Sequence, residues 1–196
     1  MEKTKRKAEL RTEAARFIKA LSREERAAKS RAACTRLTEV PEVHNAETIL
    51  LYTPLPDELD IWPALHAFND AGKRVILPKC HPREHELICI EIGDFKKELI
   101  RGSFNILEPK SGSGVGLSEL QAVITPARAF DNEANRLGRG AGYYDRFFVK
   151  TGLDVFKCGI AFDCQIFPSV PMLSHDVPVD AVVTESTLIR RNDSSA

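Results

Sequence analysis

The sequence predicts an α/β fold with a sheet that is at least partly parallel. Short apolar segments of strand character alternate with segments in which apolar residues recur at helical spacing, and turn residues such as Gly72 separate them. A length of 196 residues suits one domain, with 43% hydrophobic and 29% charged residues as in ordinary soluble proteins. We expect one domain over residues 1–190 and a flexible tail at 191–196.

Two helices are expected at the start of the chain. Over residues 2–21, apolar residues such as Leu10 and Phe17 recur at helical spacing. Ser22 with Glu25 forms a capping-box pattern, so a second helix should begin there and end before Pro41. Further helices are predicted over residues 60–71 and 143–151.

The predicted strands are the short apolar segments between and after these helices. They cover residues 46–52, 75–78, 87–92, 122–125, 159–162 and 181–184. Strands separated by helices are typical of a parallel sheet. The segment 111–116 has the composition of a plain loop.

Charge and cysteine content narrow the possible partners and the compartment. The formal net charge is zero, which gives no sign of nucleic-acid binding, and no apolar segment approaches the ~20 residues of a membrane span. The first residues are charged rather than apolar, so no signal peptide is expected. Five cysteines cannot all pair, which favours free thiols and the cytoplasm.

Positive charge gathers near the start of the chain. Residues 1–38 hold 12 Lys or Arg and five Glu, with basic residues dense at 3–7. Three interpretations stay open: a localisation or polyanion-binding patch, a solvated helix face, and a helix on which Lys7 and Arg11 contact phosphate. These two residues lie four apart, hence on one helix face.

The most informative segment is 122–145, AVITPARAFDNEANRLGRGAGYYD, in which a strand leads through a glycine-rich loop into a helix. Gly138, Gly140 and Gly142 allow backbone N–H groups to approach an anion, and the helix N-terminus adds partial positive charge. The spacing is neither that of a P-loop nor that of a dinucleotide-binding fingerprint. Glycines alone would fit a tight turn without a ligand equally well.

The side chains around this loop favour a phosphate site. Arg136 and Arg139 are suited to charge-assisted hydrogen bonds with phosphate oxygens. Asp145 is placed to hold a hard cation such as Mg²⁺. Tyr143 and Tyr144 offer flat apolar faces with polar tips.

The sequence RLGRGAGYYDRF, preceded by AFD, closely resembles the signature of the 5-formyltetrahydrofolate cyclo-ligase family, also called methenyltetrahydrofolate synthetases. Other segments resembling the family follow in order: KAELR, YTPLPDELD, LPK, NILEP, GIAFDCQ, SHD and VDAVVTE. There are departures. Ala141 stands where the family usually has Gly or Lys, Phe104 where some members have Trp, and Ala127 where Gly is common.

The resemblance implies a fold and a reaction. The fold would be a Rossmann-like three-layer domain of the NagB/RpiA/CoA-transferase type, with N-terminal helices and a mixed, mostly parallel sheet. The reaction would convert ATP and 5-formyltetrahydrofolate into 5,10-methenyltetrahydrofolate, ADP and phosphate, with Mg²⁺ as cofactor. We expect a monomer acting on two small molecules, without nucleic-acid or membrane partners.

The resemblance also implies site residues. Catalysis would involve Arg139, Tyr143 and Tyr144. ATP would be bound by Lys7, Arg11, Arg136, Gly138, Arg139, Gly140, Ala141, Gly142, Tyr143 and Tyr144. Folate would be bound by Thr53, Glu58, Phe104, Tyr143 and Tyr144. Magnesium would be held by Asp145 and Asp180.

Alternative interpretations accompany several of these residues. Asp180 also fits a buried turn carboxylate, and Glu58 fits a helix-start acid favoured by the helix dipole. The segment CHPREHELIC has residue types suited to zinc but matches no common spacing, so a polar loop between strands is the simpler interpretation. Competing functions are a sugar-phosphate isomerase or CoA transferase on the same fold, the latter with Glu58 as nucleophile, and a non-catalytic nucleotide or folate binder.

Overall fold

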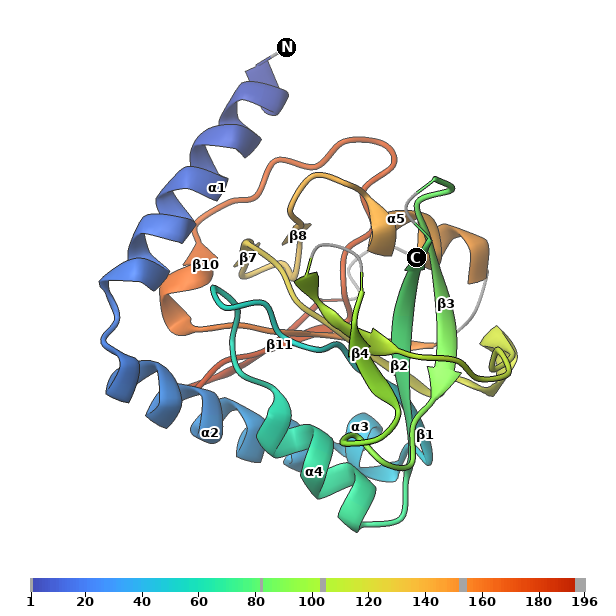
Figure 1. Ribbon diagram of the computed structural model, residues 1–196. Coiled ribbons are helices and arrows are strands. Elements are labelled where there is room, and N and C mark those ends of the chain that lie inside the picture. Colours follow the sequence, from blue (N-terminus) through green and yellow to red (C-terminus); the bar gives the residue numbers. More distant parts are fainter. Residues whose placement is uncertain (1, 82, 103–104, 152–154, 193–196) are drawn as a thin grey trace.

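A seven-stranded sheet forms the centre of the molecule. Figure 1 shows the computed structural model. The structure describes residues 2–81, 83–102, 105–151 and 155–192. From one edge to the other the strands are β12 (Leu188–Arg190), β11 (Ala181–Val183), β9 (Phe156–Ile160), β6 (Ala122–Thr125), β1 (Thr48–Leu50), β2 (Arg74–His81) and β3 (Glu86–Glu91). The inner strands run parallel, and β12 and β3 pair antiparallel at the two edges. The predicted mixed, mostly parallel sheet is confirmed.

Side chains of the central strands alternate between two apolar layers. Ile49 packs in one cluster with residues of α2 (Arg23–Glu39), α3 (Pro41–Asn45) and α4 (Trp62–Asp70). Leu50, its neighbour, packs on the opposite face with Phe147 of α5 (Tyr143–Thr151). Alternation follows from the two-residue period of a strand, and each fully buried large apolar side chain stabilises the fold by about 1.5–3 kcal/mol. Helices on both faces make the three layers that were predicted.

A second, three-stranded sheet carries the first helix. Its strands, in order, are β10 (Ile166–Phe167), β7 (Ala129–Asp131) and β8 (Arg136–Leu137). Leu10 and Ala14 of α1 (Glu2–Ala20) are buried against apolar residues of this sheet. Because the glycine-rich loop follows β8 directly, this packing brings α1 beside that loop.

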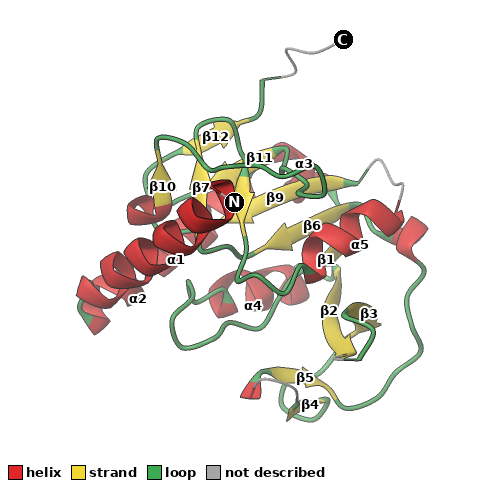
Figure 2. Cartoon of the chain, turned by 90° about the horizontal axis from the view of Figure 1, so that it is seen from above, coloured by secondary structure: helices red, strands yellow, loops and turns green. Residues whose placement is uncertain are grey.

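The remaining elements are short. They are the hairpin of β4 (Leu99–Arg101) and β5 (Leu107–Pro109) and the 3-10 turns η2 (Leu117–Glu119) and η3 (Asp163–Gln165). Figure 2 shows this hairpin next to β2 and β3, far from β12. No helix among the described residues is long and apolar enough to cross a membrane.

The capping-box prediction is confirmed in atomic detail. Glu25 N donates to Ser22 Oγ (3.1 Å), and Ser22 N donates to Glu25 Oε2 (2.8 Å). Helix α5 and strand β6 also have the predicted bounds.

One predicted strand near the C-terminal end has the wrong bounds. The strand expected at 159–162 is β9, Phe156–Ile160, because hydrogen bonding to β6 and β11 fixes its ends. Arg191 N donates to Asp180 O (2.9 Å) and Arg191 Nη1 donates to Glu133 O (3.2 Å). The flexible tail expected at 191–196 stays a prediction. Residues 193–196 lie outside the described part of the chain.

Candidate functional site

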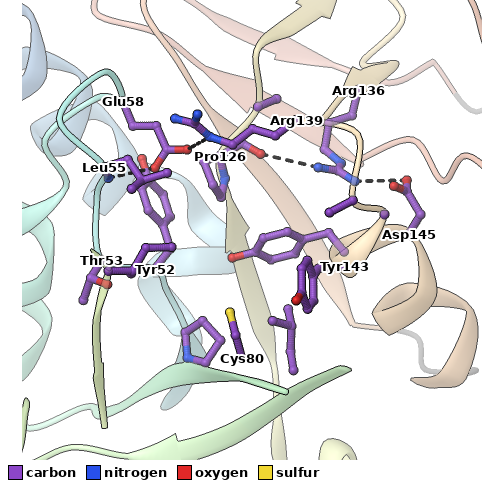
Figure 3. A pocket seen from close by; sticks show the side chains of 18 residues that line it. Tyr52, Thr53, Leu55, Glu58, Cys80, Pro126, Arg136, Arg139, Tyr143 and Asp145 are labelled. Carbon is purple, nitrogen blue, oxygen red and sulfur yellow. Dashed lines mark hydrogen bonds and ion pairs between the residues drawn. The ribbon is translucent and has the colours of Figure 1, made fainter. Parts of the chain in front are cut away.

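A pocket of about 430 Å³ opens where β1 and β6 end. The next strand of this sheet after β1 is β2, which lies on one side of β1. The next strand of this sheet after β6 is β9, which lies on the other side, so the connections that leave β1 and β6 diverge. Ligands of open parallel sheets bind at such switch points, beyond the carboxyl ends of the strands. Thr53 from the first loop and Pro126 from the second both line the pocket (Figure 3).

Most of the predicted site residues meet in this pocket. It is lined by Thr53, Glu58, Arg136, Gly138, Arg139, Ala141, Gly142, Tyr143, Tyr144 and Asp145. Phe104 lies outside the described residues. Tyr52 and Cys80 line the pocket as well. Sequence reasoning placed Tyr52 in an apolar strand and Cys80 in the segment weighed as a zinc site, and assigned neither to this pocket.

The glycine-rich loop has the backbone that its sequence predicts. Gly140 has a φ of +110° and Gly142 a φ of +68°, values that residues with a side chain rarely adopt. Immediately afterwards α5 begins at Tyr143, so its free N–H groups and partial positive charge face the loop. This geometry is suited to an anion.

Arg136 is buried behind the loop, with only 3% of its side chain exposed. It donates from Nη2 to Asp145 Oδ1 (3.0 Å), and its guanidinium lies 5.5 Å from the ring centroid of Tyr144. Its Nε is buried and has no hydrogen-bond partner among the described residues. Arg136 therefore holds Asp145 in place at the pocket wall (Figure 3). It also packs over Tyr144.

Asp145 keeps one carboxylate oxygen available. Its Oδ1 accepts the Arg136 bond and a longer one from Val177 N (3.3 Å), whereas within the described chain Oδ2 accepts none. One carboxylate oxygen at the pocket wall fits Mg²⁺, which takes one or two protein carboxylates and fills its other positions with water and phosphate.

Arg139 extends across the pocket mouth to two acidic residues. Its Nε donates to Glu58 Oε1 (2.8 Å), and its Nη2 donates to Asp57. The other Asp57 oxygen, Oδ2, pairs with Arg128 Nη2 (2.6 Å). Partial burial opposes ionisation of Asp57, but the bonds from Arg139 and Arg128 outweigh it and lower the pKa of this carboxyl.

The pocket tyrosines stay protonated at neutral pH. Burial raises the pKa of Tyr144 well above its ordinary value, and it raises that of Tyr143 as well. Burial, aided by Glu108, raises the pKa of the Cys80 thiol to about 12. The tyrosines can thus donate hydrogen bonds and form apolar walls, and Cys80 is no thiolate nucleophile.

Arg11 and Lys7 point from α1 toward the loop region, but neither lines the pocket. Arg11 Nε donates to Gly138 O (2.8 Å). Lys7 pairs with Asp176, and both side chains are nearly buried, at 7% and 9% exposure. Neither residue is therefore a freely solvated helix-face charge.

Asp180 is not brought together with Asp145. It directly precedes β11, at the amino end of the sheet, where its Oδ2 accepts from Lys157 N (2.7 Å), whereas the pocket lies at the carboxyl end. Asp180 is therefore a turn carboxylate, but with 40% of its side chain exposed it is not the buried one considered from sequence, and it lies away from Asp145. In the described part of the chain no three His, Cys, Asp or Glu side chains cluster in a way that could hold a metal.

Comparison with known families decides where this chain belongs. The model of the 5-formyltetrahydrofolate cyclo-ligase family matches residues 3–185. The chain belongs to this family. Its members convert 5-formyltetrahydrofolate to 5,10-methenyltetrahydrofolate, and the chain is an enzyme of this cyclo-ligase type.

Individual cyclo-ligases are similar over nearly their whole length. The 5-formyltetrahydrofolate cyclo-ligase of Escherichia coli (strain K12) is 34% identical over 171 residues, covering 86% of this chain and 94% of that protein. The mouse (Mus musculus) cyclo-ligase is 26% identical over 188 residues, covering 91% and 93%.

Solved structures agree with the fold. The NMR structure of Aquifex aeolicus 5,10-methenyltetrahydrofolate synthetase superposes with a TM-score of 0.84 at 33% identity, covering 97% of this chain and 95% of that one. A Mycoplasma pneumoniae 5,10-methenyltetrahydrofolate synthetase, at 22% identity, shares the fold with a TM-score of 0.74, covering 91% and 98%.

One departure from the cyclo-ligase pattern has a structural counterpart. Ala141 stands where the resemblance predicts Gly or Lys, and its carbonyl accepts a hydrogen bond from Arg146 Nη2. A Cβ on Gly142 would lie 3.1 Å from Arg146 Nη1. A guanidinium therefore lies beside the loop although the lysine is missing.

Glu58, the nucleophile of the CoA-transferase alternative, is hydrogen-bonded at both oxygens. It accepts from Arg139 Nε through Oε1 and from Leu55 N through Oε2 (3.0 Å). The family match favours the cyclo-ligase over this alternative.

Proposed function

We propose that this enzyme closes the ring of 5-formyltetrahydrofolate with ATP and Mg²⁺, releasing 5,10-methenyltetrahydrofolate, ADP and phosphate. One observation supports this most: the anion-binding loop and the residues expected to face folate line the same pocket. A γ-phosphate at the loop would thus lie near a formyl group bound against Tyr143 and Tyr144.

The chemistry requires activation of the formyl group. A formamide carbon is a poor electrophile, and its oxygen is a poor leaving group. Transfer of the γ-phosphoryl group to that oxygen, with loss of ADP, makes the carbon electrophilic. The second folate nitrogen then forms a bond to the carbon and loses its proton, and the C–O bond breaks as phosphate departs.

The protein's part in phosphoryl transfer is positioning and charge neutralisation. Backbone N–H groups of residues 138–142 and the start of α5 would hold the phosphates, with Arg139 donating to the transferred group. Arg11 supports the loop through Gly138 O. Arg11 adds positive charge on the α1 side, whereas the charge of Lys7 is compensated by Asp176.

Asp145 would hold Mg²⁺ through its available Oδ2, while Arg136 fixes the orientation of the carboxylate. When bound, Mg²⁺ neutralises charge on the phosphate oxygens. We assign the metal to Asp145 alone among the two predicted carboxylates, because Asp180 lies at the other end of the sheet.

Glu58, Thr53 and the two tyrosines would form the part of the pocket that binds folate. Glu58 is an acceptor for pterin N–H groups once it leaves Arg139. Thr53 Oγ1 donates to Leu107 O (2.5 Å), so it fixes the β5 segment beside the pocket. Tyr143 and Tyr144 supply neutral walls that exclude water from the phosphorylated intermediate.

Near-ultraviolet absorbance of the methenyl product tests the proposal. The protein is mixed with 5-formyltetrahydrofolate, ATP and Mg²⁺, and each component is omitted in turn. We expect the absorbance to rise only in the complete mixture. A rise without ATP would contradict nucleotide dependence, and no rise despite binding of both substrates would indicate a non-catalytic binder.

A further inference from the structure

Arg139, which we proposed to act on the transferred phosphoryl group, lies on the glycine-rich loop. It lies between Gly138 and Gly140, and 35% of its side chain is exposed. An arginine there has many rotamers, and a guanidinium acts on a transferring phosphoryl group only when it is already in position. Something other than the loop must hold it.

Asp57 lies between two guanidinium groups. One oxygen accepts from Arg139 Nη2, and the other pairs with Arg128 Nη2 at 2.6 Å. Asp57 itself is about half exposed, with 48% of its side chain accessible. Its position therefore depends on a fixed partner rather than on burial.

Arg128 provides that fixed partner. Its side chain is 14% exposed, and its Nη1 is buried without a hydrogen-bond partner among the described residues. Its backbone is held on both sides: N donates to Leu137 O (2.8 Å), and its carbonyl accepts from Gln165 Nε2 (3.2 Å). Gln165 is itself buried. The backbone of Arg128 is thus fixed to the three-stranded sheet. Asp57 links Arg128 to Arg139, because it contacts both guanidinium groups.

The contacts of Arg139 leave donors for a ligand. Nε is bonded to Glu58 and Nη2 to Asp57, while Nη1 has no partner among the described residues. Glu58 is expected to turn to folate, which would free Nε. Asp57 remains as the contact that can hold Arg139 during the reaction.

We infer that Asp57 and Arg128 are a positioning pair for Arg139, holding its guanidinium at the pocket mouth so that its remaining donors reach the γ-phosphate. This inference rests on the proposed function, since it takes the loop as the phosphate site. Neither residue is expected to touch nucleotide or folate.

A double-mutant cycle measured by calorimetry tests the pair. The probe is an ATP analogue with a non-transferable γ-phosphate, added with Mg²⁺ and without folate to the full-length protein. We expect Asp57→Asn to weaken binding about tenfold. In the Arg139→Ala background the same change should have no further effect, because Asp57 acts through Arg139.

Arg128 supplies a second line of evidence. Arg128→Met should weaken analogue binding in the same direction, and Arg128→Lys should recover part of the loss. Asp70→Asn, at an exposed carboxylate outside the pocket, is the matched control and should leave binding unchanged. In turnover assays Asp57→Asn should raise the KM for ATP and leave the KM for 5-formyltetrahydrofolate near the wild-type value.

The outcomes separate the two levels of the proposal. If the wild type binds the analogue but the losses of affinity caused by Asp57→Asn and Arg139→Ala add up in the double variant, the positioning role is overturned and the nucleotide site remains. Unchanged binding in both Asp57→Asn and Arg128→Met would do the same. Failure of the wild type to bind the analogue would overturn the nucleotide site itself, and the pair with it.

Discussion

Asp145 illustrates how one carboxylate fits both a structural and a catalytic role. It lies in the first turn of α5, where the helix dipole favours an acid by about 0.3–1 kcal/mol. It also compensates the charge of buried Arg136. Both roles are independent of metal, so a loss of stability in a variant would not identify a magnesium ligand.

We predict that Asp145→Asn demands more Mg²⁺ and turns over far more slowly. Loss of one of so few protein ligands should weaken the metal site. Some loss of stability is expected too, because Arg136 would remain buried without its counter-ion. The measurement is a magnesium titration of activity beside a melting curve.

Asp60→Asn is the matched control for this titration. Asp60 is also a helix-start acid, since its Oδ1 accepts from Trp62 N (3.0 Å), but it does not line the pocket. Its magnesium curve should coincide with that of the wild type. If the Asp145→Asn curve coincided as well, at a comparable rate, the metal assignment would be wrong.

The ion pair of Lys7 and Asp176 should make the fold sensitive to acid. Burial raises the pKa of Asp176, but the bond from Lys7 outweighs this, and the net shift is downward. The folded state then binds fewer protons than the unfolded state. The pair's stabilisation is therefore present above the unfolded pKa near 4 and is lost as pH falls through the lower folded value.

Chemical denaturation at several pH values checks this prediction. Asp176→Asn at neutral pH should cost about 3 kcal/mol, because Lys7 stays buried without its partner. The double variant Lys7→Met/Asp176→Asn should recover part of that free energy. Equal stabilities of wild type and Asp176→Asn at pH 7 would contradict a stabilising pair.

At the level of elements, the sequence was informative where a pattern is long or strongly local. Helices α1, α2 and α5 follow from apolar periodicity and the capping box at Ser22. Strands β7, β8 and β10 have two or three residues each, too few for a period to show. They exist because α1 and the AFD segment pack together, a tertiary effect that local patterns do not contain.

A substitution of Gly142 tests whether the loop needs its positive φ at this position to bind nucleotide. An alanine at its φ of +68° should cost about 1–2 kcal/mol in stability. Its Cβ would also meet Arg146 Nη1 at 3.1 Å. We predict that Gly142→Ala weakens nucleotide binding as well as stability, measured by calorimetry and thermal melting.

Gly72→Ala separates the two effects. Gly72 has a φ of +75°, and a Cβ there would meet no atom within 4 Å. It should show a similar loss of stability with unchanged nucleotide binding. If Gly142→Ala bound nucleotide as tightly as Gly72→Ala does, the loop's backbone would not be the phosphate site.

At the scale of the whole molecule, the pocket joins segments that are far apart in sequence. The family signature predicted Glu58 and Arg139 separately, as folate and nucleotide residues. Only the structure shows that they are bonded to each other, and that Asp57 and Arg128 join them. No spacing rule relates residues 57, 128 and 139, so sequence reasoning had no signal for this network. A monomeric state and a cytoplasmic location stay predictions.

The bond between Glu58 and Arg139 predicts that the two substrates bind cooperatively. Folate that takes Glu58 frees Arg139 for phosphate, and phosphate that takes Arg139 frees Glu58 for folate. We expect 5-formyltetrahydrofolate to tighten binding of the non-transferable ATP analogue roughly fivefold to 30-fold, with a reciprocal effect on folate.

Calorimetric titrations with and without the second ligand measure this coupling. Glu58→Gln should bind the analogue at least as tightly as the wild type does alone, and folate should then have little further effect. If the wild-type protein binds the analogue equally tightly with and without folate, the bond between Glu58 and Arg139 does not break when folate binds.

Oxygen-18 transfer tests directly whether the γ-phosphoryl group reaches the formyl oxygen. 5-Formyltetrahydrofolate labelled with ¹⁸O in the formyl group is turned over with unlabelled ATP, and the released phosphate is examined by mass spectrometry. Phosphorylation of the formyl oxygen predicts one ¹⁸O atom in each phosphate formed, because the C–O bond breaks when phosphate leaves. Phosphate without the label, formed in step with the methenyl product, would contradict it.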